Sequence, residues 1–161
     1  QIAVVLQDVF LFADTIFNNI TLNNPDISRE QVLAAAKKIG VHKFIMSLPD
    51  NYDFDVKERG VMLSSGQRQL IAFLRAYVSN PSILILDEAT SALDAFAEAE
   101  IQTLLRGFVD QGKTIISIGH RLASVVDAHQ ILFLRDGHAT EMGRLSRIPR
   151  WKFFRWYSRR K

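Results

Sequence analysis

The stretch from Leu63 to Asp94 constrains the fold more than any other part of this chain. A polar opening leads into a helix that stops at the turn Asn80-Pro81, and a strand-length apolar run, Ser82 to Leu86, follows. Two adjacent acids, Asp87 and Glu88, end that run. Because open α/β sheets place their chemistry at the carboxyl ends of buried strands, the stretch predicts an α/β fold with an acidic site at a sheet edge.

Each part of this stretch also indicates a chemistry. Ser64, Ser65 and Gly66 read as a loop of small residues that opens the helix. Free backbone N–H groups at a helix N-terminus suit an anion such as phosphate. A hard cation such as Mg²⁺ takes carboxylate oxygens, and a hydrolytic water needs a base, so Asp87 and Glu88 suit both tasks.

The sequence LSSGQ, followed by LILDEATSALD, resembles the signature motif, the Walker B motif and the D-loop of ABC-type ATPases. A helix followed by a core strand explains the apolar residues but not the two motifs together. The resemblance covers residues 1–143 and departs from the usual pattern at Ser65, where the motif more often has glycine. It implies a partial P-loop NTPase (RecA-like) parallel sheet flanked by helices, with an inserted helical subdomain at about residues 13–80.

Three further segments carry the same resemblance. Residues 1–6 read as a buried strand, and QDVFLFADTIFNNI, which begins at Gln7, resembles the Q-loop segment of exporter-type ABC ATPases. The sequence DVKERG at residues 55–60 resembles the exporter loop T-E-V-G-E-R-G, with departures at Phe54 and Lys57. A β-branched run over residues 114–118 leads to His120, which resembles the switch histidine of the H-loop.

The resemblance implies a role for each of these residues. Glu88 would be the general base, and His120 would contact the γ-phosphate of ATP. Asp87 would hold Mg²⁺, and Gln7 would sense the metal and the attacking water. The residues at positions 64–67 would bind the ATP held by the opposite subunit, and Asp94 would contact that subunit. The implied ATP-binding set is Gln7, Ser64, Ser65, Gly66, Gln67, Asp87, Asp94 and His120.

The implied function is the ATP-binding and ATP-hydrolysing part of an ABC exporter. MgATP-driven closure of two nucleotide-binding domains, in a homodimer or a heterodimer, would be coupled through a transmembrane domain to transport. The expected location is the cytoplasmic face of a membrane, with no nucleic-acid partner. Two alternatives stay open: a non-transport ABC ATPase of DNA repair or chromosome organisation, and a non-enzymatic fragment that donates LSSGQ to a partner site. The sequence upstream would separate the first of these, by membrane spans or a coiled coil.

Residues 107–114 match the phosphate-binding pattern G-x-x-x-x-G-K-[ST] literally, but the context is reversed. That loop must follow a strand and open a helix, whereas here a helical pattern precedes it and a strand pattern follows. We therefore interpret it as a helix-to-strand turn. With no authentic phosphate loop in the chain, and no initiator Met, we expect that loop to lie before Gln1. We also expect these residues alone to be inactive.

Composition adds two bounds. The chain has no cysteine, which fits a reducing compartment, and its 48% hydrophobic content suffices for one core. Of the 20 Lys and Arg residues, eight lie in residues 144–161, which contain no acid, so residues 1–143 hold 12 basic and 17 acidic residues. The basic and aromatic tail suits an anionic surface or nucleic acid. Because the family pattern stops at Gly143, we interpret the tail as lying outside the family domain.

Overall fold

The computed structural model describes residues 2–90, 93, 95–119 and 128–144. The chain divides into two compact units, residues 1–118 and residues 119–161. The first unit holds a three-stranded sheet and its helices, and the second holds a two-stranded hairpin. The boundary between residues 143 and 144, which follows from the family pattern, remains a prediction.

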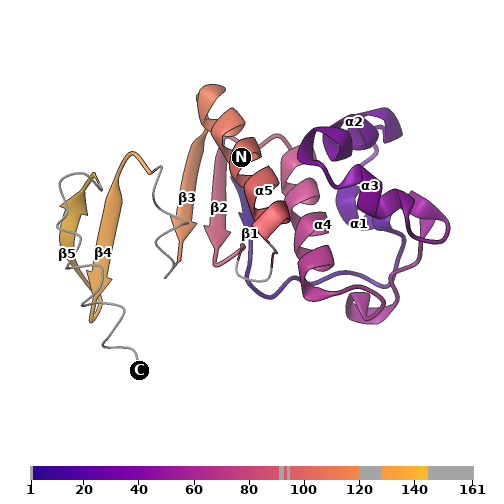
Figure 1. Cartoon of the computed structure of the whole chain (residues 1–161), viewed down its shortest axis with the longest axis horizontal. Coiled ribbons are helices and arrows are strands. Elements are labelled where there is room, and N and C mark those ends of the chain that lie inside the picture. The colour runs from indigo at the N-terminus through magenta and orange to yellow at the C-terminus, as the bar shows by residue number, and fades with distance from the viewer. Residues whose placement is uncertain (1, 91–92, 94, 120–127, 145–161) are drawn as a thin grey trace. The chain divides into compact units, whose positions relative to one another are not determined.

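The sheet of the first unit is entirely parallel. Its order is β1 (Ile2–Val5), β2 (Ile83–Asp87) and β3 (Thr114–Ile118), with β2 in the centre (Figure 1). Helices make both connections, which is the crossover that parallel strands require. The predicted class, an α/β fold with a parallel sheet flanked by helices, is confirmed.

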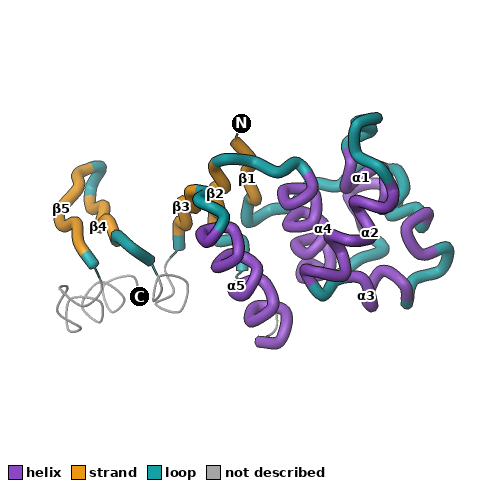
Figure 2. Tube along the Cα trace, turned by 90° about the horizontal axis from the view of Figure 1, so that it is seen from above, coloured by secondary structure: helices purple, strands orange, loops and turns teal. Residues whose placement is uncertain are grey.

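Helices occupy the chain between β1 and β2. They are α1 (Ile16–Thr21), α2 (Arg29–Ile39), α3 (His42–Met46), the short 3-10 turns η1 (Asn51–Asp53) and η2 (Glu58–Gly60), and α4 (Ser65–Val78). A further helix, α5 (Ala95–Asp110), connects β2 to β3. Both views place α4 between the strands and the group α1–α3 (Figures 1 and 2). Within the described residues, no helix has the length and apolarity needed to cross a membrane.

Local sequence signals set the ends of α2. Ser28 Oγ accepts a hydrogen bond from the Gln31 N–H at 3.2 Å, and Gln31 Oε1 accepts one from the Ser28 N–H at 2.7 Å. This reciprocal pair is the capping box that the sequence predicts. Gly40 then ends the helix in the left-handed conformation, with φ of 81°, where glycine is favoured.

The two faces of the sheet differ in their cover. Val5, Leu84 and Leu86 point to the face packed by α4 and α5, and each is at most 3% exposed. On the opposite face Val4 and Ile116, which flank Ile85 in the pairing register, are 51% and 47% exposed. The strand expected over residues 1–6 is present, but the expectation that it is buried is wrong, because no described element of the first unit covers the second face.

The second unit contains β4 (Ile131–Arg135) and β5 (His138–Gly143), which pair antiparallel. Asp136 and Gly137 form the turn, with φ of 50° and 78°. Two consecutive positive φ angles are typical of the tight hairpin turn that the Asp-Gly pair predicts. The predicted hairpin is confirmed.

Candidate functional site

The predicted acidic site lies at the edge of the sheet where the three parallel strands end. Parallel pairing runs through Val5 with Leu86 and ends with Asp87 opposite Ile118, so the carboxyl ends of all three strands lie at the same edge. Gln7 follows β1 at this edge and is exposed, whereas Asp87 and Glu88 are half-buried. The structure thus brings two predicted carboxylates and the predicted amide to one end of the sheet. Their oxygen atoms are donors of the kind that Mg²⁺ takes.

The backbone of Glu88 is held in place by the neighbouring strand. Its N–H donates to the carbonyl oxygen of Ile118 at 2.9 Å, and its φ is 48°. A non-glycine residue rarely adopts a positive φ, and such residues cluster where the surrounding structure serves a function. The chain therefore turns sharply at Glu88 while remaining bonded to β3, which fixes where this carboxylate leaves the sheet.

The signature residues form the N-terminus of α4. Ser64 is the N-cap: its Oγ accepts from the Gln67 N–H at 3.2 Å, and Gln67 Oε1 accepts from the Ser64 N–H at 2.8 Å. Ser65 and Gly66 are the first two helical residues, so the expected loop over residues 64–66 is wrong. The capping box starts the helix earlier, yet the first N–H groups of a helix still lack acceptors within it, which retains the predicted capacity for an anion.

Two predicted site residues, His120 and Asp94, lie outside the described residues, and so does the tail over residues 145–161. Their roles stay predictions. Among the described residues, no group of three His, Cys, Asp or Glu side chains gathers as a self-contained metal site. Mg²⁺ in nucleotide enzymes usually takes one or two carboxylates together with substrate phosphates, and the single carboxylate of Asp87 suits that arrangement.

The literal phosphate-loop pattern at residues 107–114 lies at a helix-to-strand turn. Gly107 lies inside α5, Gly112 has φ of 75° in the turn that follows, and β3 begins at Thr114. The order is helix and then strand, as the rejection of this motif required. Gly107 is therefore an ordinary helical residue, Gly112 forms the turn after the helix, and neither wraps a phosphate.

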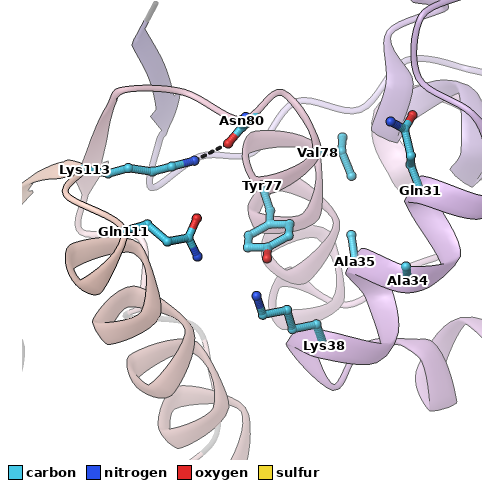
Figure 3. A pocket seen from close by; sticks show the side chains of 9 residues that line it. All are labelled: Gln31, Ala34, Ala35, Lys38, Tyr77, Val78, Asn80, Gln111 and Lys113. Carbon is cyan, nitrogen blue, oxygen red and sulfur yellow. Dashed lines mark hydrogen bonds between the residues drawn. The ribbon is translucent and has the colours of Figure 1, made fainter.

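A hollow of about 320 Å³ lies elsewhere, between α2, the end of α4 and the turn before β3 (Figure 3). Lys38 stands over the ring of Tyr77 at 5.7 Å, and Lys113 donates a hydrogen bond to Asn80 (Figure 3). None of the predicted site residues lines this hollow. It is therefore separate from the acidic sheet edge and from the N-terminus of α4.

Sequence reasoning missed a set of buried polar side chains behind the site. Gln69 and Asn19 are each 1% exposed, and Arg75 reaches the backbone of the segment that follows β1. The signal was available, because Gln69 falls on the same helical stripe as the buried Ala72, Phe73 and Ala76. A polar side chain on an apolar stripe must find a partner inside the protein.

A parallel sheet with acids at its carboxyl edge, flanked by helices and interrupted by a helical insertion, defines a P-loop NTPase type of α/β fold. The family model for ABC transporters matches residues 1–91, more than half of the chain, and the chain belongs to this family.

Relatives with known names agree with this assignment. The chain is 44% identical over 143 residues to the ABC transporter ATP-binding protein YknV of Bacillus subtilis, covering 89% of this chain and 24% of that protein. It is 46% identical over 143 residues to a putative multidrug export ATP-binding/permease protein of Staphylococcus aureus, covering 89% and 25%. The chain thus spans about a quarter of the length of these relatives.

A solved structure of a bacterial Atm1-family ABC exporter with ATP bound matches with a TM-score of 0.89 and 40% identity. The match covers 99% of this chain and 28% of the exporter chain.

Proposed function

We propose that this chain is the larger part of the nucleotide-binding domain of an ABC exporter, and that the parent protein hydrolyses ATP to drive transport. The observation that carries the proposal is the placement of Asp87 and Glu88 at the carboxyl edge of the sheet, with the Glu88 backbone bonded to Ile118 at 2.9 Å. The likeness to an exporter with ATP bound, and to relatives named as export ATP-binding/permease proteins, supports it.

The acidic edge would act on the ATP of this chain's own site. Asp87 would hold Mg²⁺ through water, and the bound metal would neutralise phosphate charge. Glu88 would accept a proton from the water that attacks the γ-phosphate, and His120 would contact that phosphate. Gln7 would place its amide near the metal and the water. A water-activating base is commonly worth about 10²–10⁴ in rate, which is the effect asked of Glu88.

The N-terminus of α4 would act on the ATP of a second nucleotide-binding domain. Ser65 and Gly66 begin the helix, and their N–H groups and the helix dipole favour an anion. The capping box ties up Ser64 and Gln67 in the isolated chain, so both side chains would exchange these bonds for phosphate when a dimer closes. Asp94 would contact the partner at the same interface.

The transmembrane domain would be the second partner, at the cytoplasmic face of a membrane. Phe10 and Phe12 are 55% and 54% exposed, and their rings lie edge to face at 5.2 Å. An exposed aromatic pair in the segment that follows Gln7 suits an apolar protein surface. The excess of acids over bases in residues 1–143 argues against nucleic acid as the partner.

The 161 residues contain no phosphate loop in the correct context, so we propose that they do not turn over ATP by themselves. MgATP hydrolysis by residues 1–161 at the rate of an intact ABC ATPase would contradict this. The alternative is a non-enzymatic fragment that only donates LSSGQ to a partner site. It is tested by measuring ATP binding by the chain alone and by the chain mixed with an intact nucleotide-binding domain.

The direct test of the catalytic role is Glu88→Gln in the full-length protein. Removing the base should lower MgATP turnover by about 10²–10⁴ while ATP binding persists, because glutamine keeps the size and loses the proton acceptor. Turnover is measured by phosphate release, with Glu30→Gln, an exposed substitution in the first turn of α2, as the matched control. Unchanged turnover in Glu88→Gln would remove Glu88 from the role.

A further inference from the structure

Two polar side chains of α4 hold the segment that carries Gln7. Gln69, which is 1% exposed, donates from Nε2 to the carbonyl oxygen of Leu6 at 3.2 Å. Arg75 donates from Nη1 to the carbonyl oxygen of Phe10 at 3.3 Å. These two carbonyls stand on either side of Gln7 in the sequence. The Gln7 segment is therefore attached at both ends to one helix.

The second anchor belongs to a larger network. Arg75 Nε donates to the carbonyl oxygen of Asn19 at 2.8 Å, and Nη2 donates to Asn19 Oδ1 at 3.4 Å. Asn19 in turn accepts from the Phe12 N–H at 2.8 Å and donates to the Phe12 carbonyl at 3.0 Å. Burial lowers the pKa of Arg75, and a guanidinium removed from water needs acceptors of this kind. The network fixes the chain just beyond Gln7.

Gln7 and Asp8 lie between the two anchors in the sequence, and both are exposed. The bonds from Gln69 and Arg75 to this segment go to the backbone carbonyls of Leu6 and Phe10. The two anchors therefore do not engage the Gln7 side chain itself.

We propose that Gln69 and Arg75 are positioning residues that keep the Gln7 segment in register with α4, the helix whose N-terminus carries LSSGQ. This rests on the proposed function, in which Gln7 serves this chain's own ATP and LSSGQ serves the partner's ATP. Both bonds go to backbone carbonyls, so they act whatever side chains stand at positions 6 and 10. Helix α4 then joins the two half-sites mechanically: a shift of its N-terminus on the partner's nucleotide displaces the Gln7 segment of the same chain.

The test compares two substitutions on α4 in the full-length protein. Gln69→Leu removes the donor with little change in volume, and Ile71→Val, at a site also 1% exposed, removes a buried methyl group but no hydrogen-bond donor. Residues 1–161 contain no cysteine. A nitroxide can therefore be attached at Asp8→Cys once any cysteines elsewhere in the full-length protein have been replaced by serine. The electron paramagnetic resonance line shape, recorded without nucleotide, reports how mobile the segment is.

We expect Gln69→Leu to narrow the nitroxide lines and Ile71→Val to leave them unchanged. In unlabelled protein, the Mg²⁺ concentration for half-maximal turnover should rise about two- to tenfold in Gln69→Leu, the usual net worth of one hydrogen bond, and stay constant in Ile71→Val. Arg75→Lys keeps the positive charge but loses the several N–H donors of the guanidinium, and it should also narrow the nitroxide lines. This variant replaces Gln69→Leu in the test if Gln69→Leu fails to fold.

Unchanged nitroxide mobility in Gln69→Leu and Arg75→Lys would overturn the anchoring, and so would equal narrowing in Ile71→Val. Increased mobility with an unchanged Mg²⁺ requirement would overturn the link to metal use. The mobility measurement needs no ATP, so it stands apart from the proposed function, whose own failure would appear as full turnover in Glu88→Gln.

Discussion

At the scale of single residues, Gly60 joins η2 to the segment that follows Gln7. Its φ is +67°, and a Cβ there would lie 2.9 Å from Leu11 Cδ1, a side chain that is fully buried. Glycine is therefore required twice, by the left-handed backbone and by the close approach. Leu11 stands between the exposed Phe10 and Phe12 in the sequence, and its packing against Gly60 anchors this part of the segment.

We predict that Gly60→Ala destabilises the full-length protein by about 2–3 kcal/mol, combining left-handed strain with overpacking. Gly107→Ala is the matched control, because Gly107 is helical and a Cβ there meets nothing within 4 Å. That control should be neutral, or stabilising by up to about 1 kcal/mol. Chemical denaturation measures both. Equal stability of the two variants would contradict the packing argument at Gly60.

Lys57 shows how a departure from the family pattern is accommodated. It has φ of 61° and ψ of −178°, a region that favours glycine, and glycine is the residue that the exporter loop has at this place. Asp55 offsets the strain, since its Oδ1 accepts from the Lys57 N–H and its Oδ2 from Lys57 Nζ, both at 2.8 Å. The sequence identified the substitution, but only the backbone geometry reveals how it is held.

At the scale of elements, the signals that lie within a few residues predicted the structure well. The capping box at Ser28, the stop at Gly40 and the hairpin at Asp136-Gly137 all depend on local hydrogen bonds or on φ preferences, and all are present. The acids at the end of β2 were also predicted from a local signal, because they directly follow the apolar run in the sequence. What sequence reasoning missed depends on distant partners: Gln69 meets Leu6 across 63 positions, which no local pattern encodes.

Which face of the sheet is packed also depends on segments that are distant in the sequence. The exposed face leads to a prediction. Residues 1–161 should self-associate and bind a hydrophobic dye, because Val4 and Ile116 leave an apolar face in water. The double substitution Val4→Thr with Ile116→Thr keeps β-branched side chains and should reduce both effects. Light scattering and dye fluorescence measure them. A wild-type chain that stays monomeric and binds no dye would contradict the prediction.

At the scale of the whole molecule, the proposed function gives the chain parts of two different sites. Asp87 and Glu88 lie at the carboxyl edge of the sheet, while LSSGQ begins α4, whose N-terminus is closed by a capping box. Under the proposed function, the first pair serves the nucleotide of its own subunit and the second serves the nucleotide of another. The central claim is therefore that each active site draws on two subunits.

ATP turnover in a linked dimer of the full-length protein tests this claim directly. One dimer carries Glu88→Gln in one subunit and Ser64→Arg in the other, and the second dimer carries both substitutions in the same subunit. If the sites are shared, the first dimer keeps one intact site and about half of the wild-type turnover, or less if the sites are coupled, and the second loses both sites. The reverse result, with activity only when both substitutions lie in one subunit, would contradict the account.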